Sequence, residues 1–161
     1  MDEAVTPAEV RAAVKQLPAR TVLGLTLWGE ARGEPVEGQV AVAWVIKNRA
    51  ARRHQTVQYV CLDRWQFSCW WGQDPNAQAL RARARRVITG DVVPEPRWLK
   101  ILQLAHQVLN DVVPDPTLGA DHYLTTALYQ DDDAPTWARV LPVTVTIGHH
   151  TFLKDTGERR A

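Results

Sequence analysis

Along the first two thirds of the chain, apolar residues recur every three to four positions, which is the spacing of one face of an α-helix. Proline, glycine and capping residues interrupt this pattern where helices begin and end. The pattern predicts helices over residues 7–17, 19–31, 35–51, 76–89 and 95–110. Residues 55–75 are rich in aromatic side chains and glutamine but have no clear period, so we expect irregular or briefly extended structure there.

The pattern changes in the last third of the chain, where apolar and polar residues begin to alternate. Apolar residues separated by single threonines predict a β-strand over residues 143–147. A turn at 148–149 and a second short strand at 150–153 complete a hairpin. Helices therefore precede a small antiparallel sheet in the C-terminal part, and the predicted fold class is α+β and mostly helical.

Length and composition indicate a single domain. A chain of 161 residues is long enough to bury one core, so we expect one domain over residues 1–161, with a short N-terminal helix at 7–17 and a polar tail at 155–161. No segment approaches the roughly 20 apolar residues needed to cross a bilayer. The net charge of +1 disfavours nucleic acid as the main partner. We expect a monomer whose partners include neither nucleic acid nor a membrane.

The chain has two cysteines, Cys61 and Cys69, which are too few for a disulfide framework. We expect both to be reduced thiols. Their spacing is not that of a zinc site, and the sequence contains no H-E-x-x-H motif. His149 and His150 fall in the predicted hairpin, where a metal role is disfavoured. We therefore expect neither a metal nor another cofactor.

The segment at residues 28–35 contains the strongest candidate for chemistry, Glu30. Glu30 follows Leu27 by three residues and Leu23 by seven, so at helical spacing it projects from the same side as these leucines. A carboxylate among apolar neighbours, near the negative end of a helix dipole and before the predicted helix stop at Gly33, is costly to ionise. Such a group suits general acid catalysis near neutral pH. A solvated glutamate at a helix end is the alternative interpretation.

Four further segments follow this one along the chain. The five segments read GEARGEP at 29–35, GQVAVAWVIKNR at 38–49, QFSCW at 66–70, GADHY at 119–123 and IGHHTF at 147–152. This ordered set resembles the SleB-like cell-wall hydrolases, the family of the spore cortex-lytic enzyme and of related phage endolysins. The resemblance covers most of the chain. It implies a lysozyme-like or lytic-transglycosylase-like domain that acts on peptidoglycan glycan strands.

The resemblance also implies a reaction. In SleB-like enzymes one glutamate, here Glu30, acts as acid and then as base, and the muramic acid's own 6-hydroxyl closes an anhydro ring at the cleaved MurNAc–GlcNAc β-1,4 bond. The residues alone leave a hydrolytic lysozyme open, because glycoside hydrolysis commonly uses a second carboxylate. The candidates for that group are Glu34, Asp63, Asp74 and Asp121.

Six residues are candidates for substrate binding. Tryptophan and phenylalanine rings stack on sugar faces, while glutamine and serine supply orienting hydrogen bonds. The candidates are Glu34, Gln66, Phe67, Ser68, Trp70 and Tyr123, with Tyr123 assigned by the resemblance. Burial in an aromatic cluster is the alternative for the tryptophans of this region, and Glu34 is also placed to complement the dipole of the following helix.

Two other function classes stay open from the sequence. One is a catalytically inactive wall-binding domain with the same fold. The other is an amidase or peptidase that cuts stem peptides, for which the chain offers Cys69 and His122 as a candidate pair. The first four residues, Met-Asp-Glu-Ala, contain no basic or apolar segment of an export signal. We therefore expect a phage endolysin that is made in the host cytoplasm and acts in the periplasm or cell wall.

Overall fold

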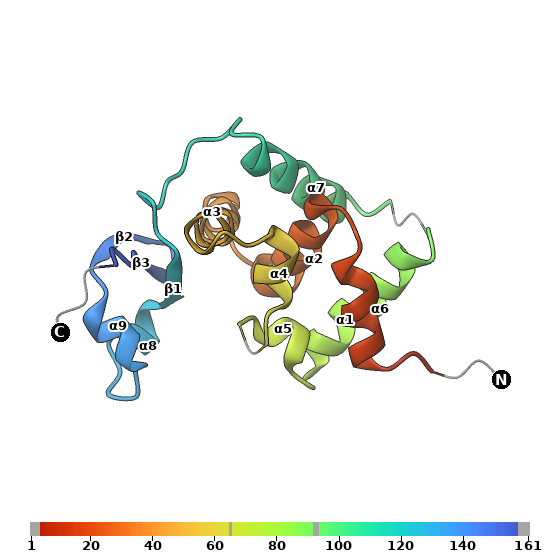
Figure 1. The fold of residues 1–161 in the computed structure, drawn as a ribbon, viewed down its shortest axis with the longest axis horizontal. Coiled ribbons are helices and arrows are strands. Elements are labelled where there is room, and N and C mark those ends of the chain that lie inside the picture. Colours follow the sequence, from red (N-terminus) through yellow and green to blue (C-terminus); the bar gives the residue numbers. More distant parts are fainter. Residues whose placement is uncertain (1–3, 65, 92–93, 158–161) are drawn as a thin grey trace.

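The computed structural model describes residues 4–64, 66–91 and 94–157, so the ends of the expected domain and the last four residues of the expected tail lie outside the described residues. A helical body is joined to a smaller lobe that contains the sheet (Figure 1). The elements are α1 (Pro7–Lys15), α2 (Ala19–Ala31), α3 (Val36–Arg53), α4 (Val57–Leu62), α5 (Ser68–Trp71), α6 (Pro75–Ile88), α7 (Pro96–Leu109), β1 (His122–Thr125), α8 (Thr126–Tyr129), α9 (Thr136–Val140), β2 (Val143–Ile147) and β3 (His150–Leu153).

Helix α2 is the centre of the helical body and packs against α3, α4, α5, α6 and α7. Val22, Leu23, Leu25 and Leu27 are all fully buried, although they do not share one helix face. A helix that is apolar on all sides is expected in the interior of a domain rather than at its surface. The sequence prediction for this helix, 19–31, is confirmed. Its burial holds the last turn, and with it Glu30, in a fixed place.

The segment at 55–75 differs from the sequence prediction, because it contains the two short helices α4 and α5. Thr56 begins α4, and its side chain accepts a hydrogen bond from the backbone N–H of Tyr59 at 3.0 Å. Helices of four to six residues are too short to show an amphipathic period, and tertiary packing rather than intrinsic propensity stabilises them. The prediction of irregular or extended structure was therefore wrong here.

The start of α6 also differs from expectation. Asp74, not Asn76, is the N-cap, and its side chain accepts from the backbone N–H of Ala77 at 2.8 Å. The Asn76 side chain donates instead to the carbonyl oxygen of Gly29 at 2.9 Å. Asn76 therefore links the first turn of α6 to the last turn of α2, next to Glu30.

The sheet has three antiparallel strands in the order β1-β3-β2. The predicted hairpin of β2 and β3 is confirmed with the predicted boundaries. Strand β1 and the short helices α8 and α9 were not predicted from the sequence. In β1, Tyr123 pairs with Phe152 of β3, and Phe152 packs with Ala41 and Val45 of α3. This contact joins the sheet to the helical body, and the fold is α+β and mostly helical as predicted.

Among the described helices, none combines the length and the hydropathy that a membrane-spanning segment requires.

Candidate active site

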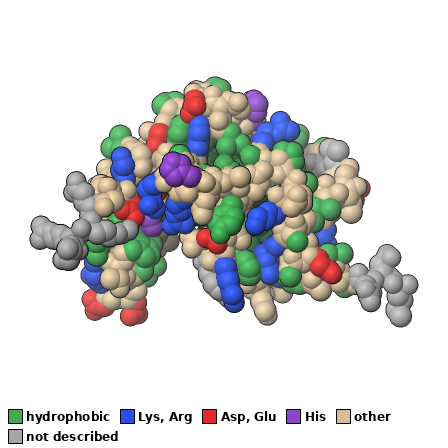
Figure 2. Space-filling model, viewed as in Figure 1, with side chains coloured by type: hydrophobic (Ala, Val, Ile, Leu, Met, Phe, Trp, Pro, Cys, Tyr) green, Lys and Arg blue, Asp and Glu red, His purple; other side chains and the backbone are tan. Residues whose placement is uncertain are grey.

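A hollow of about 730 Å³ lies between the helical body and the sheet-bearing lobe. Figure 2 shows the surface hollowed between these two parts of the molecule. Its walls come from the last turn of α2, from α3, from the segment at 66–68, and from β1, β3 and the chain around α8 and α9. Segments that are distant in sequence therefore meet at one concave surface, which is the usual form of a small-molecule or substrate site.

Glu30 lines this hollow from the last turn of α2. One carboxylate oxygen, Oε1, accepts a hydrogen bond from the backbone N–H of Cys69 at 3.3 Å. The other, Oε2, accepts from the hydroxyl of Tyr123 at 3.2 Å. Two donors from opposite walls hold the carboxyl group in one orientation, as a general acid requires.

Gly29 allows this geometry, because it lets α5 approach the end of α2 closely. A Cβ atom at position 29 would lie 2.7 Å from Cδ2 of Leu80 and 2.9 Å from Cβ of Cys69. Any side chain there would push α5 away, and the N–H of Cys69 would no longer reach Glu30. The glycine in the GEARGEP segment thus has a packing role beside the candidate acid.

Tyr123 reaches Glu30 from strand β1, and its ring stacks on Phe152 with the centroids 5.9 Å apart. Burial raises the pKa of the Tyr123 hydroxyl well above its usual value, and the negative charge of Glu30 raises it further. The hydroxyl therefore stays protonated near neutral pH and donates its hydrogen bond to Glu30.

We expect Tyr123→Phe to fold normally and to turn over at least tenfold more slowly, because a hydrogen bond to a charged group contributes roughly 1.5–3 kcal/mol. The substitution removes only the hydroxyl and keeps the ring on Phe152. The measurement is kcat on purified peptidoglycan, together with the melting temperature. An unchanged kcat would show that the hydroxyl does not act on Glu30.

Arg49 of α3 forms part of the same wall and was not predicted from the sequence. It is 6% exposed, and it donates to the carbonyl oxygen of Asp121 at 2.9 Å and to Oε1 of Gln66 at 3.4 Å. Burial lowers its pKa, and the nearby charge of Arg53 lowers it further. The guanidinium stays charged even so, and it gives the hollow a buried positive charge while holding Gln66 in place.

Glu30 is the only carboxylate among the described residues that line this hollow. Asp74 caps α6, and Asp63 accepts a hydrogen bond from the backbone N–H of Arg64. Asp121 is buried and bonded to Arg52. Burial acts to raise its pKa, but hydrogen bonds from His122 and from the backbone N–H of residue 155, with the charge of Arg52, lower that pKa to about 2. None of these three faces Glu30 across the hollow.

Comparison with known proteins identifies the chain. Residues 33–153, about three quarters of its length, match the model of the family described as Cell Wall Hydrolase. The chain belongs to the Cell Wall Hydrolase family. The match begins three residues after Glu30, so the role of this residue rests on the geometry of the hollow and on the GEARGEP segment.

Two solved structures resemble this cell wall hydrolase. One is the catalytic domain of the germination-specific lytic transglycosylase SleB from Bacillus anthracis, with 26% identity over 84% of this chain and 93% of that chain, at a TM-score of 0.57. The other is the catalytic domain of the Bacillus cereus SleB protein, with 26% identity over 84% of this chain and 89% of that chain, at a TM-score of 0.58. No curated protein matches the chain significantly. The predicted SleB-like character is confirmed.

Four of the predicted substrate-binding residues of this cell wall hydrolase line the hollow, namely Tyr123 and the consecutive residues Gln66, Phe67 and Ser68. Gln66 and Ser68 are exposed, whereas Phe67 is buried with Arg49 packed over its ring at 5.6 Å. The segment therefore offers two polar side chains to a ligand, and Phe67 shapes the floor beneath them.

The prediction that Trp70 binds substrate was wrong. Trp70 is fully buried, and its indole N–H donates to the hydroxyl of Thr26 inside the core at 3.0 Å. Its ring cannot stack on a sugar. Among the described residues, the tryptophan that lines the hollow is Trp137 of α9, whose ring centroid lies 5.0 Å from that of His122. No sequence period marks Trp137, because α9 is only five residues long.

Glu34 does not line the hollow, which disfavours the predicted substrate contact. Its two carboxylate oxygens lie 3.8 Å from Nδ1 of His149 and 3.9 Å from Nδ1 of His150, at the turn between β2 and β3. Helix α3 begins after Pro35 without a side-chain cap, so Glu34 does not cap it either. Gly33 also differs from expectation, because α2 ends on Arg32 without a left-handed glycine.

Both cysteines of this cell wall hydrolase are buried thiols. Burial raises the pKa of Cys61 to about 12 and that of Cys69 well above its usual value, and for Cys69 the charge of Glu30 acts in the same direction. A thiol that does not ionise is a poor nucleophile, which disfavours the Cys69 and His122 peptidase hypothesis. His122 instead places Nδ1 2.9 Å from Asp121. Within the described ranges, no group of three or more His, Cys, Asp or Glu side chains is placed to hold a metal ion.

Proposed function

We propose that this cell wall hydrolase is a lytic transglycosylase that cleaves the MurNAc–GlcNAc β-1,4 bond of peptidoglycan glycan strands. The observation that supports this most is the single carboxylate, Glu30, among the described residues of the hollow. A hydrolase with two carboxylates needs a second one opposite the first, at a separation of roughly 5–10 Å. A transglycosylase does not, because the substrate supplies its own nucleophile.

In the proposed reaction, the protonated carboxyl group of Glu30 donates its proton to the glycosidic oxygen as the bond to C1 of the muramic acid breaks. The resulting carboxylate then accepts the proton of the muramic acid 6-hydroxyl, whose oxygen bonds to C1 and closes the 1,6-anhydro ring. Glu30 is thereby returned to its protonated form, and no water is consumed. The hydrogen bonds from the N–H of Cys69 and the hydroxyl of Tyr123 stabilise the carboxylate between the two proton transfers.

The same hollow offers groups for binding the glycan. Gln66, held by Arg49, and the exposed Ser68 are placed to hydrogen-bond sugar hydroxyl and acetamido groups. Trp137 and His122 form the aromatic surface on the opposite lobe, where a sugar ring would stack. We propose that this pair takes the role that the sequence prediction gave to Trp70.

Digestion of purified peptidoglycan tests the function class. We expect the released fragments to be disaccharides or oligosaccharides that still carry their stem peptides, at a rate unchanged by a metal chelator or by Cys69→Ser. Release of free stem peptides would identify an amidase or peptidase, and binding without any release would identify a wall-binding domain. Either result would contradict the proposal.

The endolysin role, with synthesis in a host cytoplasm, stays a prediction. Family membership supports action on the cell wall. Expression inside Gram-negative cells, with and without a membrane-permeabilising agent, would test it. The prediction requires that lysis occur only when the membrane is opened.

A further inference from the structure

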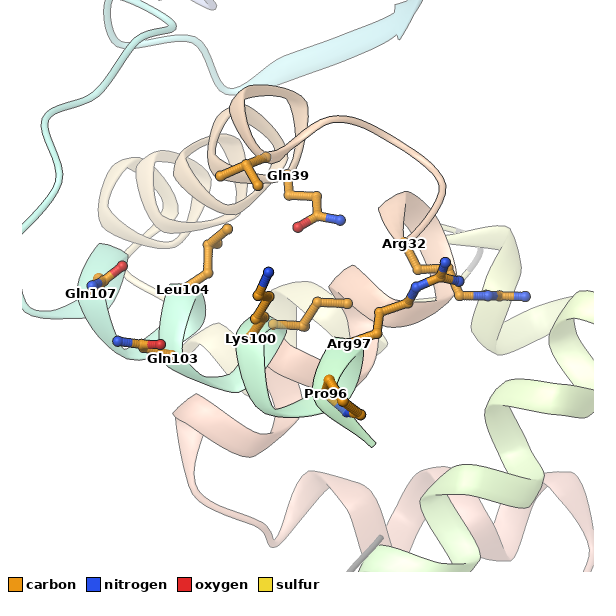
Figure 3. A pocket seen from close by; sticks show the side chains of 10 residues that line it. Arg32, Gln39, Pro96, Arg97, Lys100, Gln103, Leu104 and Gln107 are labelled. Atoms are coloured by element: carbon orange, nitrogen blue, oxygen red, sulfur yellow. The ribbon is translucent and has the colours of Figure 1, made fainter. Parts of the chain in front are cut away.

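A second hollow, of about 460 Å³, lies outside the candidate active site, in the groove between α7 and the end of α2 with the start of α3. Figure 3 shows Arg97 and Lys100 rising from α7 toward Arg32 and Gln39 on the other wall. Ile101 and Leu104 of α7 contribute apolar surface to the same groove. The groove therefore combines a positively charged rim with an aliphatic floor.

The cations of this groove have no acidic counterpart. Arg32, Arg97 and Lys100 line it together with three glutamines, and no Asp or Glu is among the described lining residues. Arg97 and Lys100 are exposed, and neither has a carboxylate partner within the part of the chain that the structure describes. The protein as a whole has a net charge of only +1, so three cations gathered without an acid make this groove a local concentration of positive charge.

A further cation, Arg83, lies near Arg32 at the ring of Trp28. The guanidinium groups of Arg32 and Arg83 lie 3.9 Å and 4.5 Å, respectively, from the centroid of the Trp28 ring. Arg83 is 9% exposed in its side chain and pairs with Glu95 through one nitrogen, while its Nε and its other terminal nitrogen have no hydrogen-bond partner. Burial lowers the pKa of Arg32, and the charges of Arg97 and Arg83 lower it further. A bound anion would relieve this repulsion.

The chemistry of the lining favours a short acidic peptide over a bare inorganic anion. Guanidinium groups bind carboxylates through two parallel hydrogen bonds, and Lys100 adds a point charge. Gln103 and Gln107 can bond the amide groups of a peptide, while Ile101 and Leu104 can pack against its methyl and methylene groups. The volume of the groove far exceeds that of one phosphate ion, so most of it would be empty around such a ligand.

We propose that the groove lined by Arg32, Arg97 and Lys100 binds the free carboxylates of peptidoglycan stem peptides. This inference rests on the proposed function, because it supposes that the glycan strand carrying those peptides is the substrate. Arg32 lies two residues after Glu30, so the peptide groove and the catalytic hollow are on two sides of the same helix end. The groove would then hold the wall polymer beside the hollow while Glu30 cleaves the glycan.

The double variant Arg97→Gln with Lys100→Gln tests the proposal. We expect it to raise KM for intact, peptide-bearing peptidoglycan about tenfold or more, because two charge-assisted contacts are lost. Cleavage of peptide-free glycan strands should be unchanged. The matched control is Arg20→Gln with Arg86→Gln, which removes the same charge from exposed positions outside the groove. The control should behave like the wild-type protein on both substrates.

Direct binding distinguishes the possible sources of the anion. A free stem tetrapeptide titrated into the wild-type protein should shift the amide resonances of α7, and the double variant should lose this shift. Equal KM values for variant and control on intact peptidoglycan would overturn the inference. So would saturation of the same resonances by inorganic phosphate more tightly than by the tetrapeptide, which would identify a phosphate site. Failure of the wild-type protein to cleave either substrate would instead count against the proposed function.

Discussion

Replacing Glu30 with glutamine should abolish glycan cleavage and leave the fold intact. Loss of a general acid typically costs roughly 10²–10⁴ in rate, and more is lost when the same group must also act as base. Glutamine keeps the size of the side chain; its amide oxygen can still accept from the N–H of Cys69, and its NH2 group can donate to the hydroxyl oxygen of Tyr123. The rate of muropeptide release, measured beside the circular dichroism spectrum, checks the prediction.

Glu34→Gln is the matched control, because it makes the same chemical change four residues further along the chain. Glu34 lies beside His149 and His150 at the sheet turn and not in the hollow, so we expect this variant to keep most of its activity. A Glu30→Gln variant with more than about a tenth of wild-type activity would contradict the assignment of the acid. Equal inactivity of both folded variants would contradict the single-acid reaction.

Replacing Trp70 with alanine should produce the largest loss of stability. Trp70 is fully buried in the main core and donates to the hydroxyl of Thr26 of α2, so its removal leaves a cavity and one hydrogen bond fewer in the core. Substitution of a buried tryptophan typically costs roughly 3–5 kcal/mol. Denaturant unfolding, followed by circular dichroism, measures this change directly.

Trp137→Ala provides the comparison on the surface of the hollow. Its ring is only partly buried and stands beside His122, so the free energy of unfolding should change far less while KM for peptidoglycan rises. If Trp70→Ala unfolded at the wild-type denaturant concentration and lost only substrate affinity, the stacking role first predicted for Trp70 would be right after all. Such a result would contradict its burial.

The elements predicted correctly from the sequence are those whose own residues specify them. Helix α2 has a long apolar segment, α1 has the capping box of Thr6 and Glu9, and the β2–β3 hairpin alternates polar and apolar residues. Strand β1 and helix α5 have four residues each and exist because neighbouring elements pack on them. No local pattern of so few residues separates them from a loop.

The same distinction applies to the candidate site. Glu30 could be predicted because its helix position and the GEARGEP segment both mark it within a few residues. Arg49 reads in the sequence as one more cation near a helix end, and only the approach of β1 and the 66–68 segment buries it in the hollow. Trp70 was wrongly assigned to the substrate, and Trp137 was not singled out, because the burial of a single aromatic ring depends on tertiary contacts.

The mass of the muramic acid end of the products tests the central claim most directly. Peptidoglycan is digested to completion with the wild-type protein, and the muropeptides are analysed by mass spectrometry before and after borohydride reduction. With Glu30 as the only acid and base, the products should end in 1,6-anhydro-N-acetylmuramic acid, lighter by one water and unchanged by borohydride. Reducing N-acetylmuramic acid ends would contradict the account, because they require a water and a second group to activate it.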